Sequence, residues 1–228
     1  RRGRCARSRD RYTRAMPTSR FPNLRLLDHP LILHKLTLAR DARTKSPEFR
    51  RLIGEIAGLM AFETFRHLPL EPVRIDTPVG PTEGARISQP TTLVPILRAG
   101  IGMTEGLLAL LPEARVGHLG IYRDEETATP VRYYSKMPED IADGPVLLVD
   151  PMLATGGSAC AAADELRRLG CANLRMICLV AAPAGVERML ESHPDIPIHA
   201  AALDERLDEN SYIVPGLGDA GDRIFGTR

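Results

Sequence analysis

Apolar residues recur at helical spacing in the first third of the chain. Between residues 47 and 68 they follow one another at steps of three and four, which places them on one face of a helix. Residues 31–44 also favour a helix. We therefore expect two consecutive helices before residue 69. The apolar face of the second consists of Phe49, Leu52, Ile53, Ile56, Leu59, Met60 and Phe62.

Further along, the apolar residues form short continuous runs, which are typical of strands buried in a parallel sheet. Pro95 lies inside the first run and argues against a central position for that strand. Residues 69–90 are rich in proline, glycine and charge, and favour short strands with turns. The acidic residues 124–126 predict a turn between two paired strands. The other expected strands are 91–97, 116–123, 131–134, 146–149 and 174–181.

The last two of these strands, with the residues between them, predict a βαβ unit. Residues 158–169 lie between them and place Ala159, Ala162 and Leu166 on one helical face, with Gly170 at the C-terminal end. Residues 101–111 favour another helix. Alternating strands and helices indicate an α/β fold, with a mostly parallel central sheet flanked by helices. In such folds ligands bind at the carboxyl ends of the strands.

The composition limits the class of protein further. A chain of 228 residues with 43% hydrophobic residues is long enough for one large domain with its own core. No apolar run reaches the roughly 18 residues of a membrane span, so we expect no membrane partner. The cysteines at 5, 160, 171 and 178 lack the spacing of a zinc site. Reduced thiols in a cytoplasmic protein are the expected state.

The charge is distributed unevenly. Residues 1–15 carry seven arginines and one aspartate, whereas the rest of the chain is net acidic. A basic arm is compatible with nucleic-acid binding or targeting. A disordered tail or a start-site extension before Met16 is the interpretation we favour. We therefore expect a basic arm at 1–15, a single domain at 16–228, and no nucleic-acid partner.

The segment 146–158 carries the strongest chemical signal. An apolar strand ends at Asp150, and a short loop leads through Thr155, Gly156 and Gly157 to Ser158 at a helix start. Amide groups at a helix N-terminus, together with the two hydroxyls, form a phosphate-binding cradle. An aspartate at the strand end can hold sugar hydroxyls. A plain strand-to-helix turn with Ser158 as the N-cap remains the alternative.

Two other segments carry candidate chemistry. Arg98 follows an apolar strand, and its planar guanidinium suits a diphosphate, although an ordinary surface ion pair is the alternative. Arg123 precedes three acidic residues and, taken alone, fits a solvated turn. Residues 213–223 are dense in glycine, which exposes backbone groups that can recognise a base; a flexible tail is the alternative.

Four ordered segments carry a family resemblance. The sequence 150–157 resembles the phosphoribosyl pyrophosphate (PRPP) loop of the type I phosphoribosyltransferases, in the variant with one acid followed by proline. That variant is similar to the one in the uracil phosphoribosyltransferase family. Residues 95–100 resemble that family's pyrophosphate-side loop and 122–127 its mobile hairpin. Residues 212–223 resemble its base-binding segment.

The resemblance implies a type I phosphoribosyltransferase fold with a mobile hairpin lid and a C-terminal base-binding segment. It implies transfer of a phosphoribosyl group from PRPP to uracil, giving UMP and diphosphate. Arg98, Arg123 and Asp150 are the implied catalytic residues. Uracil is assigned to Ile213, Gly218, Asp219 and Ala220. The implied PRPP-binding residues are Arg98, Arg123, Asp150, Pro151, Met152, Leu153, Ala154, Thr155, Gly156, Gly157, Ser158 and Asp219.

The implied cofactor is Mg²⁺, held mainly through substrate oxygens and without dedicated protein ligands. The loop position where many relatives carry an acid is Ala154, so we assign no general base. The six histidines show no catalytic spacing, and we expect them to be structural or on the surface. The resemblance also implies a cytoplasmic homo-oligomer and a possible GTP effector.

Two alternatives remain. A pyrimidine-sensing RNA-binding regulator with the same fold would need a basic face, and the acidic body argues against it. A purine phosphoribosyltransferase would need a different base-binding segment from 212–223.

Overall fold

A nine-stranded sheet forms the centre of the protein. The structure is a computed structural model that describes residues 20–123 and 130–227. Along the main path of the sheet all neighbouring strands are parallel except the last two, so the expected mostly parallel sheet is confirmed. The path runs β1 (Leu24–Leu26), β11 (Ile198–Leu203), β10 (Leu174–Ala181), β8 (Val146–Val149), β4 (Thr92–Leu97), β6 (His118–Arg123) and β7 (Pro130–Lys136). Two short strands complete it, β5 (Arg115–Val116) beside β4 and β9 (Met152–Leu153) beside β10.

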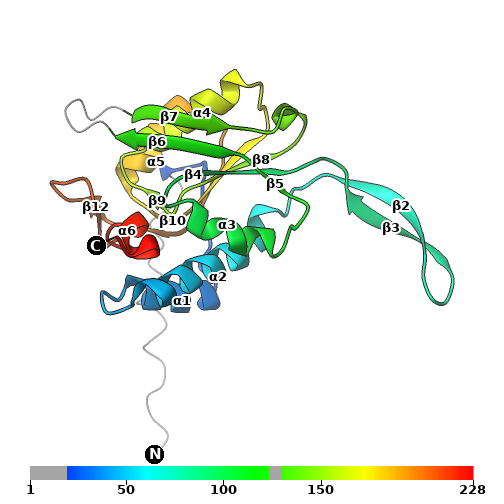
Figure 1. Ribbon diagram of the computed structural model, residues 1–228, viewed down its shortest axis with the longest axis horizontal. Helices are drawn as coiled ribbons and strands as arrows, with labels where there is room; N and C mark the ends of the chain where they lie inside the picture. The colour runs from blue at the N-terminus through cyan, green and yellow to red at the C-terminus, as the bar shows by residue number, and fades with distance from the viewer. Residues whose placement is uncertain (1–19, 124–129, 228) are drawn as a thin grey trace, which may run out of the picture.

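Helices cover both faces of the sheet (Figure 1). Successive residues of β8 and β10 are buried on opposite faces: Leu147 and Ile177 belong to one apolar cluster, Leu148 and Met176 to the other. This explains why these strands are apolar throughout. One face is covered by α4 (Gly157–Arg168) and α5 (Pro183–Ser192). The other is covered by α1 (Pro30–Arg40), α2 (Ser46–Thr64), α3 (Ile101–Leu108) and α6 (Ala220–Phe225).

Most predicted elements are confirmed with small shifts at their ends. The two N-terminal helices end earlier than the expected residues 44 and 68. In α1 the reason is local, because the Asp41 carboxylate accepts from the Arg43 amide (2.9 Å) and the Thr44 hydroxyl donates to the Leu38 carbonyl (2.7 Å). These bonds compete with the continuing helix. Gly170 has a positive φ of 87° just after α4, as its expected capping role requires.

The expectation that Pro95 disfavours a central strand is wrong. β4 lies between β8 and β6, and Pro95 is in register with Val149. Thr92 donates to the β8 side and Leu93 accepts from Gly117 on the β5–β6 side. Successive residues of a strand direct their backbone groups to alternate sides, so Pro95 faces the same side as Leu93. On that side the strand that pairs with β4 changes from β5 to β6. The ladder is already interrupted there, which removes the usual cost of a proline.

Residues 69–90 form one hairpin that extends away from the body (Figure 1). Its strands are β2 (Leu70–Asp76) and β3 (Pro81–Ile87), antiparallel over their whole length. The expected strands in this region are confirmed, although they are longer than expected. The arm exposes Leu70, Ile75 and Val79.

A second small hairpin follows β11. It consists of β12 (Arg206–Leu207) and β13 (Ile213–Val214), which pair antiparallel, and α6 comes after it. Within the ranges 20–123 and 130–227, no helix is long and apolar enough to cross a membrane. Cys160, Cys171 and Cys178 are buried free thiols, whereas Cys5 lies outside the described residues.

Candidate functional site

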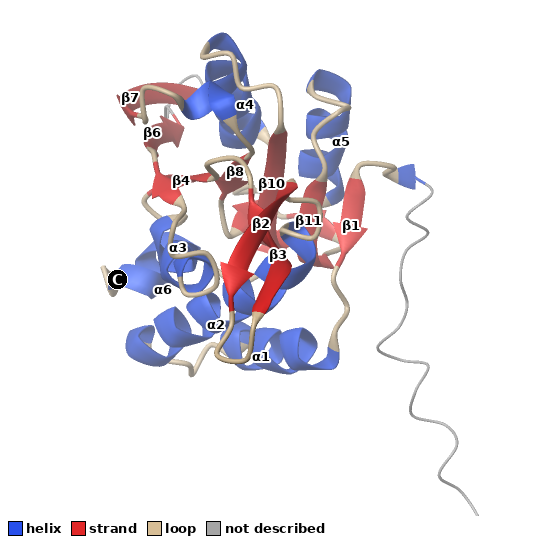
Figure 2. Cartoon of the chain, turned by 90° about the vertical axis from the view of Figure 1, so that its right-hand side faces the viewer, coloured by secondary structure: helices blue, strands red, loops and turns tan. Residues whose placement is uncertain are grey.

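The strand order reverses between β4 and β8. From β4 the chain continues through α3 to β6 on one side, and from β8 it continues through α4 to β10 on the other. Figure 2 shows β4 and β8 with α3 and α4 on opposite sides of the sheet. The parallel strands end at the same edge, and a reversal of this kind opens a crevice between the loops that follow them. The candidate site is the pair of loops after β4 and β8.

The loop after β8 forms a cradle at the start of α4. A hollow of about 80 Å³ is lined by Asp150 and by residues 152–159. This is room for two or three water molecules at about 30 Å³ each, which suits one phosphate group better than a whole nucleotide. Gly156 is the N-cap residue and has a φ of 76°, so α4 begins at Gly157. Ser158 therefore does not cap the helix, and the strand-to-helix turn with Ser158 as N-cap is not what forms.

The amides of this cradle are available to a ligand. No side chain caps α4. Among the described residues, no hydrogen bond involves the hydroxyls of Thr155 and Ser158 or the amides of Gly157 and Ser158. The N-terminus of a helix also carries a partial positive charge. The cradle therefore presents several donors and a favourable field to a phosphate.

Asp150 lies at the end of β8, beside this cradle. Its carboxylate accepts from the Met152 amide at 3.2 Å. Burial raises the pKa of Asp150 to about 7, against the smaller opposing effect of that hydrogen bond. Burial, with a smaller contribution from Asp150, also raises the pKa of the neighbouring Cys178 thiol. Donors from a ligand would stabilise the ionised carboxylate, so Asp150 is suited to hold hydroxyl groups.

The loop after β4 lies directly against the end of β8. A Cβ placed on Gly100 would be 2.4 Å from the Val149 carbonyl oxygen. Only glycine permits this approach. It brings the loop that carries Arg98 next to Asp150. The Leu97–Arg98 peptide bond is cis, and the Arg98 side chain is 58% exposed.

The C-terminal segment approaches the other side of the Arg98 loop. Arg98 Nη2 lies 3.4 Å from Asp222 Oδ1, and a Cβ on Gly221 would be 3.9 Å from that of Ala99. Asp219 is exposed, and its carboxylate caps α6 by accepting from the Asp222 amide at 2.8 Å. The cap is a role that the sequence analysis did not assign. The structure therefore brings together the loops 98–100 and 150–158 and the segment 213–222.

The predicted base-contacting residues differ in exposure. Ile213 and Ala220 are buried, whereas Gly218 and Asp219 are exposed. Gly218 has a φ of 71°, a conformation that glycine adopts without strain. The sequence 213–223 is thus ordered by β13 and α6, and the alternative of a flexible tail is wrong.

Arg123 ends β6, whose carboxyl end lies at the same edge of the sheet because β6 and β4 are parallel. β6 and β7 pair as the expected hairpin. The side chain of Arg123 and the predicted turn at 124–126 lie outside the described residues.

The sequence analysis missed three charged residues near the C-terminal segment. Arg40 and Asp204 form an ion pair beside Gly216, and Arg223 binds the Leu217 carbonyl. Asp204 carries a recognisable signal, because it follows the mostly apolar residues 198–203 in the way that Asp150 follows 146–149. Arg40 and Arg223 offered none, since an arginine in a helix is most often a surface residue.

The described part of the chain contains no group of three or more His, Cys, Asp or Glu side chains arranged to hold a metal ion. His193 and His199 are buried, and His29, His34 and His67 are exposed. None of the histidines belongs to the loops that follow β4 and β8.

Comparison with known proteins agrees with this geometry. A family model described as uracil phosphoribosyltransferase matches residues 26–227. A uracil phosphoribosyltransferase of Shouchella clausii is 56% identical over 204 residues, which are 89% of this chain and 98% of that protein. The corresponding protein of Streptococcus salivarius has the same identity and coverage. The solved structure of the AQ2163 protein from Aquifex aeolicus has a TM-score of 0.85 at 37% identity, covering 89% of this chain and 97% of that one.

Proposed function

The chain belongs to the uracil phosphoribosyltransferase family, and from that premise we propose how its own residues carry out the family reaction. The protein is a pentosyltransferase that converts uracil and PRPP to UMP and diphosphate in pyrimidine salvage. The observation that carries the proposal is the contact of Gly100 with the end of β8. It supports the proposal because it brings the loop of Arg98, the proposed diphosphate-binding residue, close to the loop that we propose binds the ribose phosphate.

PRPP binds across the two loops in this proposal. The amides and hydroxyls of residues 154–158 bind the 5′-phosphate, because they are unpaired donors at a helix N-terminus. The Asp150 carboxylate accepts from the ribose hydroxyls. Met152 and Leu153 line the hollow between these two parts of the site, and Pro151 joins them to Asp150 in the chain.

Arg98 and Arg123 stabilise the departing diphosphate. Bond breaking at C1 of the ribose leaves negative charge on the diphosphate oxygens and positive charge on the ring. Guanidinium groups near those oxygens favour the transition state over the ground state. No side chain is assigned as a general base, so catalysis rests on positioning and on leaving-group stabilisation.

Uracil binds to the C-terminal segment. Ile213, Gly218, Asp219 and Ala220 supply backbone donors and acceptors for its two carbonyls and its N–H. Asp219 contacts the phosphoribosyl group as well. The short distance between Arg98 and Asp222 supports this arrangement, because it sets the segment beside the diphosphate loop.

Mg²⁺ is the proposed cofactor. When bound with PRPP it neutralises charge on the diphosphate. The residues present fit a metal held mainly through substrate oxygens, since Asp150 is the carboxylate of the cradle and no cluster of three ligating side chains occurs in the described ranges. Mg²⁺ commonly binds in this way, with few protein ligands.

The β6–β7 hairpin is proposed as a lid. It follows a strand that ends at the site edge and carries Arg123 at its end. Closure over PRPP would exclude water, which otherwise competes with uracil.

A homo-oligomer is part of the proposal. The β2–β3 arm exposes Leu70, Ile75 and Val79, and a two-stranded hairpin has little stability by itself. Contact with a second copy would cover these side chains. Sedimentation of the protein and of a variant without residues 72–85 tests this.

The remaining parts of the proposal come from the family resemblance. They are a cytoplasmic location, a response to GTP, and a single domain at 16–228. The continuous path of the central sheet from β1 at one edge to β7 at the other supports the single domain. The basic arm at 1–15 lies outside the described residues. Assays with and without GTP test the effector.

The experiment that tests the function follows diphosphate release with each base in turn, with PRPP and Mg²⁺. Uracil should be the substrate, and Asp150→Asn should reduce its use severely. Turnover of guanine or hypoxanthine without uracil would contradict the proposal and favour the purine enzyme. RNA binding without turnover would favour the regulator.

A further inference from the structure

A buried ion pair holds the base-binding segment at one residue. Arg40, the last residue of α1, donates from both Nη atoms to the Asp204 carboxylate at 2.7 Å. Arg40 Nη1 also donates to the Gly216 carbonyl at 2.8 Å, and Asp204 accepts from the Gly216 amide at 2.7 Å. One ion pair therefore binds both polar backbone groups of Gly216.

Gly216 needs this support because of its conformation. Its φ is 60°, and a Cβ at this position would lie 2.1 Å from the Ile213 carbonyl oxygen. The backbone turns sharply here, between Ile213 and Gly218. Asp204 is itself fixed at the end of β11, where its amide donates to the Ala181 carbonyl at 2.8 Å. These bonds fix the position of the turn relative to the central sheet.

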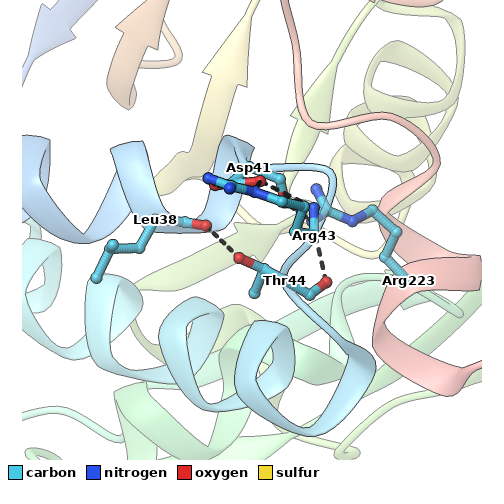
Figure 3. Close-up of polar contacts among 5 residues, drawn as sticks. All are labelled: Leu38, Asp41, Arg43, Thr44 and Arg223. Carbon is cyan, nitrogen blue, oxygen red and sulfur yellow. Dashed lines mark hydrogen bonds and ion pairs between the residues drawn. The ribbon is translucent and has the colours of Figure 1, made fainter.

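A second arginine binds the next carbonyl. Arg223 Nη1 donates to Leu217 (2.7 Å) and to Ala39 (2.8 Å), both through their carbonyl oxygens. Its Nη2 donates to the Asp41 and Thr44 carbonyls at 2.9 and 3.4 Å (Figure 3). The guanidinium lies 4.0 Å from the centre of the Phe49 ring. The Arg223 guanidinium therefore links the segment 216–217 to the connection between α1 and α2.

These contacts occupy the carbonyls of residues 216 and 217. The groups left to bind a base lie on either side, at Ile213 and at residues 218–220. Their positions depend on the angle of the turn between them. A backbone site discriminates between bases only while its donors and acceptors keep fixed positions, since a shift of about 1 Å breaks a hydrogen bond.

We propose that Arg40, through its ion pair with Asp204, is a positioning residue that sets the affinity for the base and its selection, without contacting either substrate. The proposal rests on the proposed role of residues 213–220 in uracil binding. The Asp204 side chain is only 6% exposed and that of Arg40 23%. The planar guanidinium makes three bonds at once, which the single ammonium of lysine does not reproduce.

The test compares Arg40→Lys and Arg40→Met with the parent enzyme. KM for uracil should rise about tenfold in Arg40→Lys and further in Arg40→Met, while KM for PRPP changes less than about twofold. The ratio of kcat/KM for uracil over cytosine should fall in the same order. A purely structural role would instead lower the melting temperature and the active fraction, and leave both KM values unchanged.

Lys35→Met is the matched control. Lys35 lies on the same helix, and its side chain is 25% exposed and pairs with Glu55 at 2.5 Å. Its loss should lower stability without altering either KM. If Arg40→Met does not fold, Arg40→Lys decides the question. An unchanged KM for uracil in the folded Arg40 variants, or an equal rise in both KM values, overturns the proposal. A parent enzyme that does not use uracil would overturn the proposed function instead.

Discussion

Gly100 lies against the Val149 carbonyl so closely that a Cβ there would be 2.4 Å from its oxygen. Gly100→Ala should therefore push the Arg98 loop away from Asp150. We expect kcat/KM to fall about 10²-fold and stability to fall by about 1–3 kcal/mol. Gly80→Ala is the control, since a Cβ on Gly80 meets nothing within 4 Å. Steady-state kinetics and urea unfolding measure both effects; full activity in Gly100→Ala would show that the loops need not touch.

Arg98→Ala should act mainly on the transition state. Its guanidinium is exposed and 3.4 Å from Asp222 in the free protein, so its removal should cost little stability. The kcat/KM for uracil should fall by about 10²-fold or more. Arg66→Ala removes an exposed arginine paired with Glu63 and should leave kinetics unchanged. Near-normal turnover in Arg98→Ala would rule out the assigned role.

The affinity for PRPP should depend on the ionisation of Asp150. Burial raises its pKa to about 7, so the carboxylate fraction rises about tenfold between about pH 6 and pH 8. The ionised form accepts from ribose hydroxyls, and KM for PRPP should therefore fall across this range. Asp150→Asn should bind PRPP more weakly and should keep only the part of the pH dependence that comes from the phosphates, whose pKa is about 6. If KM for PRPP has the same pH profile in Asp150→Asn as in the parent, Asp150 is not the source of that pH dependence.

Stability at mildly acidic pH should depend on His199. Burial lowers its pKa to about 4, with smaller effects of Arg25 and Arg175. The unfolded chain, with a pKa near 6.5, binds more protons below that pH, so this group contributes stability that is lost as the pH falls from about 6.5 to about 4. Between pH 7 and about pH 5.5 the loss is about 1 kcal/mol.

The raised pKa of Asp150 acts in the opposite direction over the same range, so the two effects offset each other in the parent protein. The measurement is therefore the difference between parent and His199→Gln in urea unfolding at the two pH values. On acidification the free energy of unfolding of the variant should rise relative to that of the parent by about 1 kcal/mol. An equal change in the two proteins would mean that His199 titrates normally in the folded protein.

The donor and acceptor groups along the edge of the base should determine which base is used. Backbone groups at Ile213 and at 218–220 have fixed donor and acceptor identity, and cytosine exchanges an acceptor of uracil for a donor. Each buried mismatch costs about 1–3 kcal/mol, and two approach a 10⁴-fold rejection. A fluorine at C5 changes none of these edge groups. We expect 5-fluorouracil to be used and cytosine, adenine and guanine to be rejected, measured as diphosphate release. Efficient use of cytosine would show that these backbone groups do not select the base.

Local features of the fold were predictable because the apolar pattern is local. The strand 174–181 and the cradle at 150–158 depend on residues that are adjacent in sequence. The position of Pro95 was not predictable, since its cost depends on which strand lies beside it.

The contacts of Arg40 show the same limit for the site. Asp204 and Gly216 lie 164 and 176 residues further along the chain. Periodicity and short motifs carry no information about such a pair. The loop motifs indicate which chemistry to expect at residues 95–100 and 150–158, whereas the contacts that hold residues 216 and 217 could be found only in the tertiary structure.

The ties of Arg40 and Arg223 to distant parts of the chain also bear on synthesis at the ribosome. Arg223 joins Ala39 across 184 residues of sequence. A nascent chain that has released residues up to α5 can already form the phosphate cradle, because the loop after β8 bonds to β10 and lies against Gly185 of α5. The turn at Gly216 and its contacts with α1 must wait until residues 216–223 have emerged. A chain translated only as far as α5 should therefore hold the phosphate cradle but be inactive toward uracil until the C-terminal segment has been added.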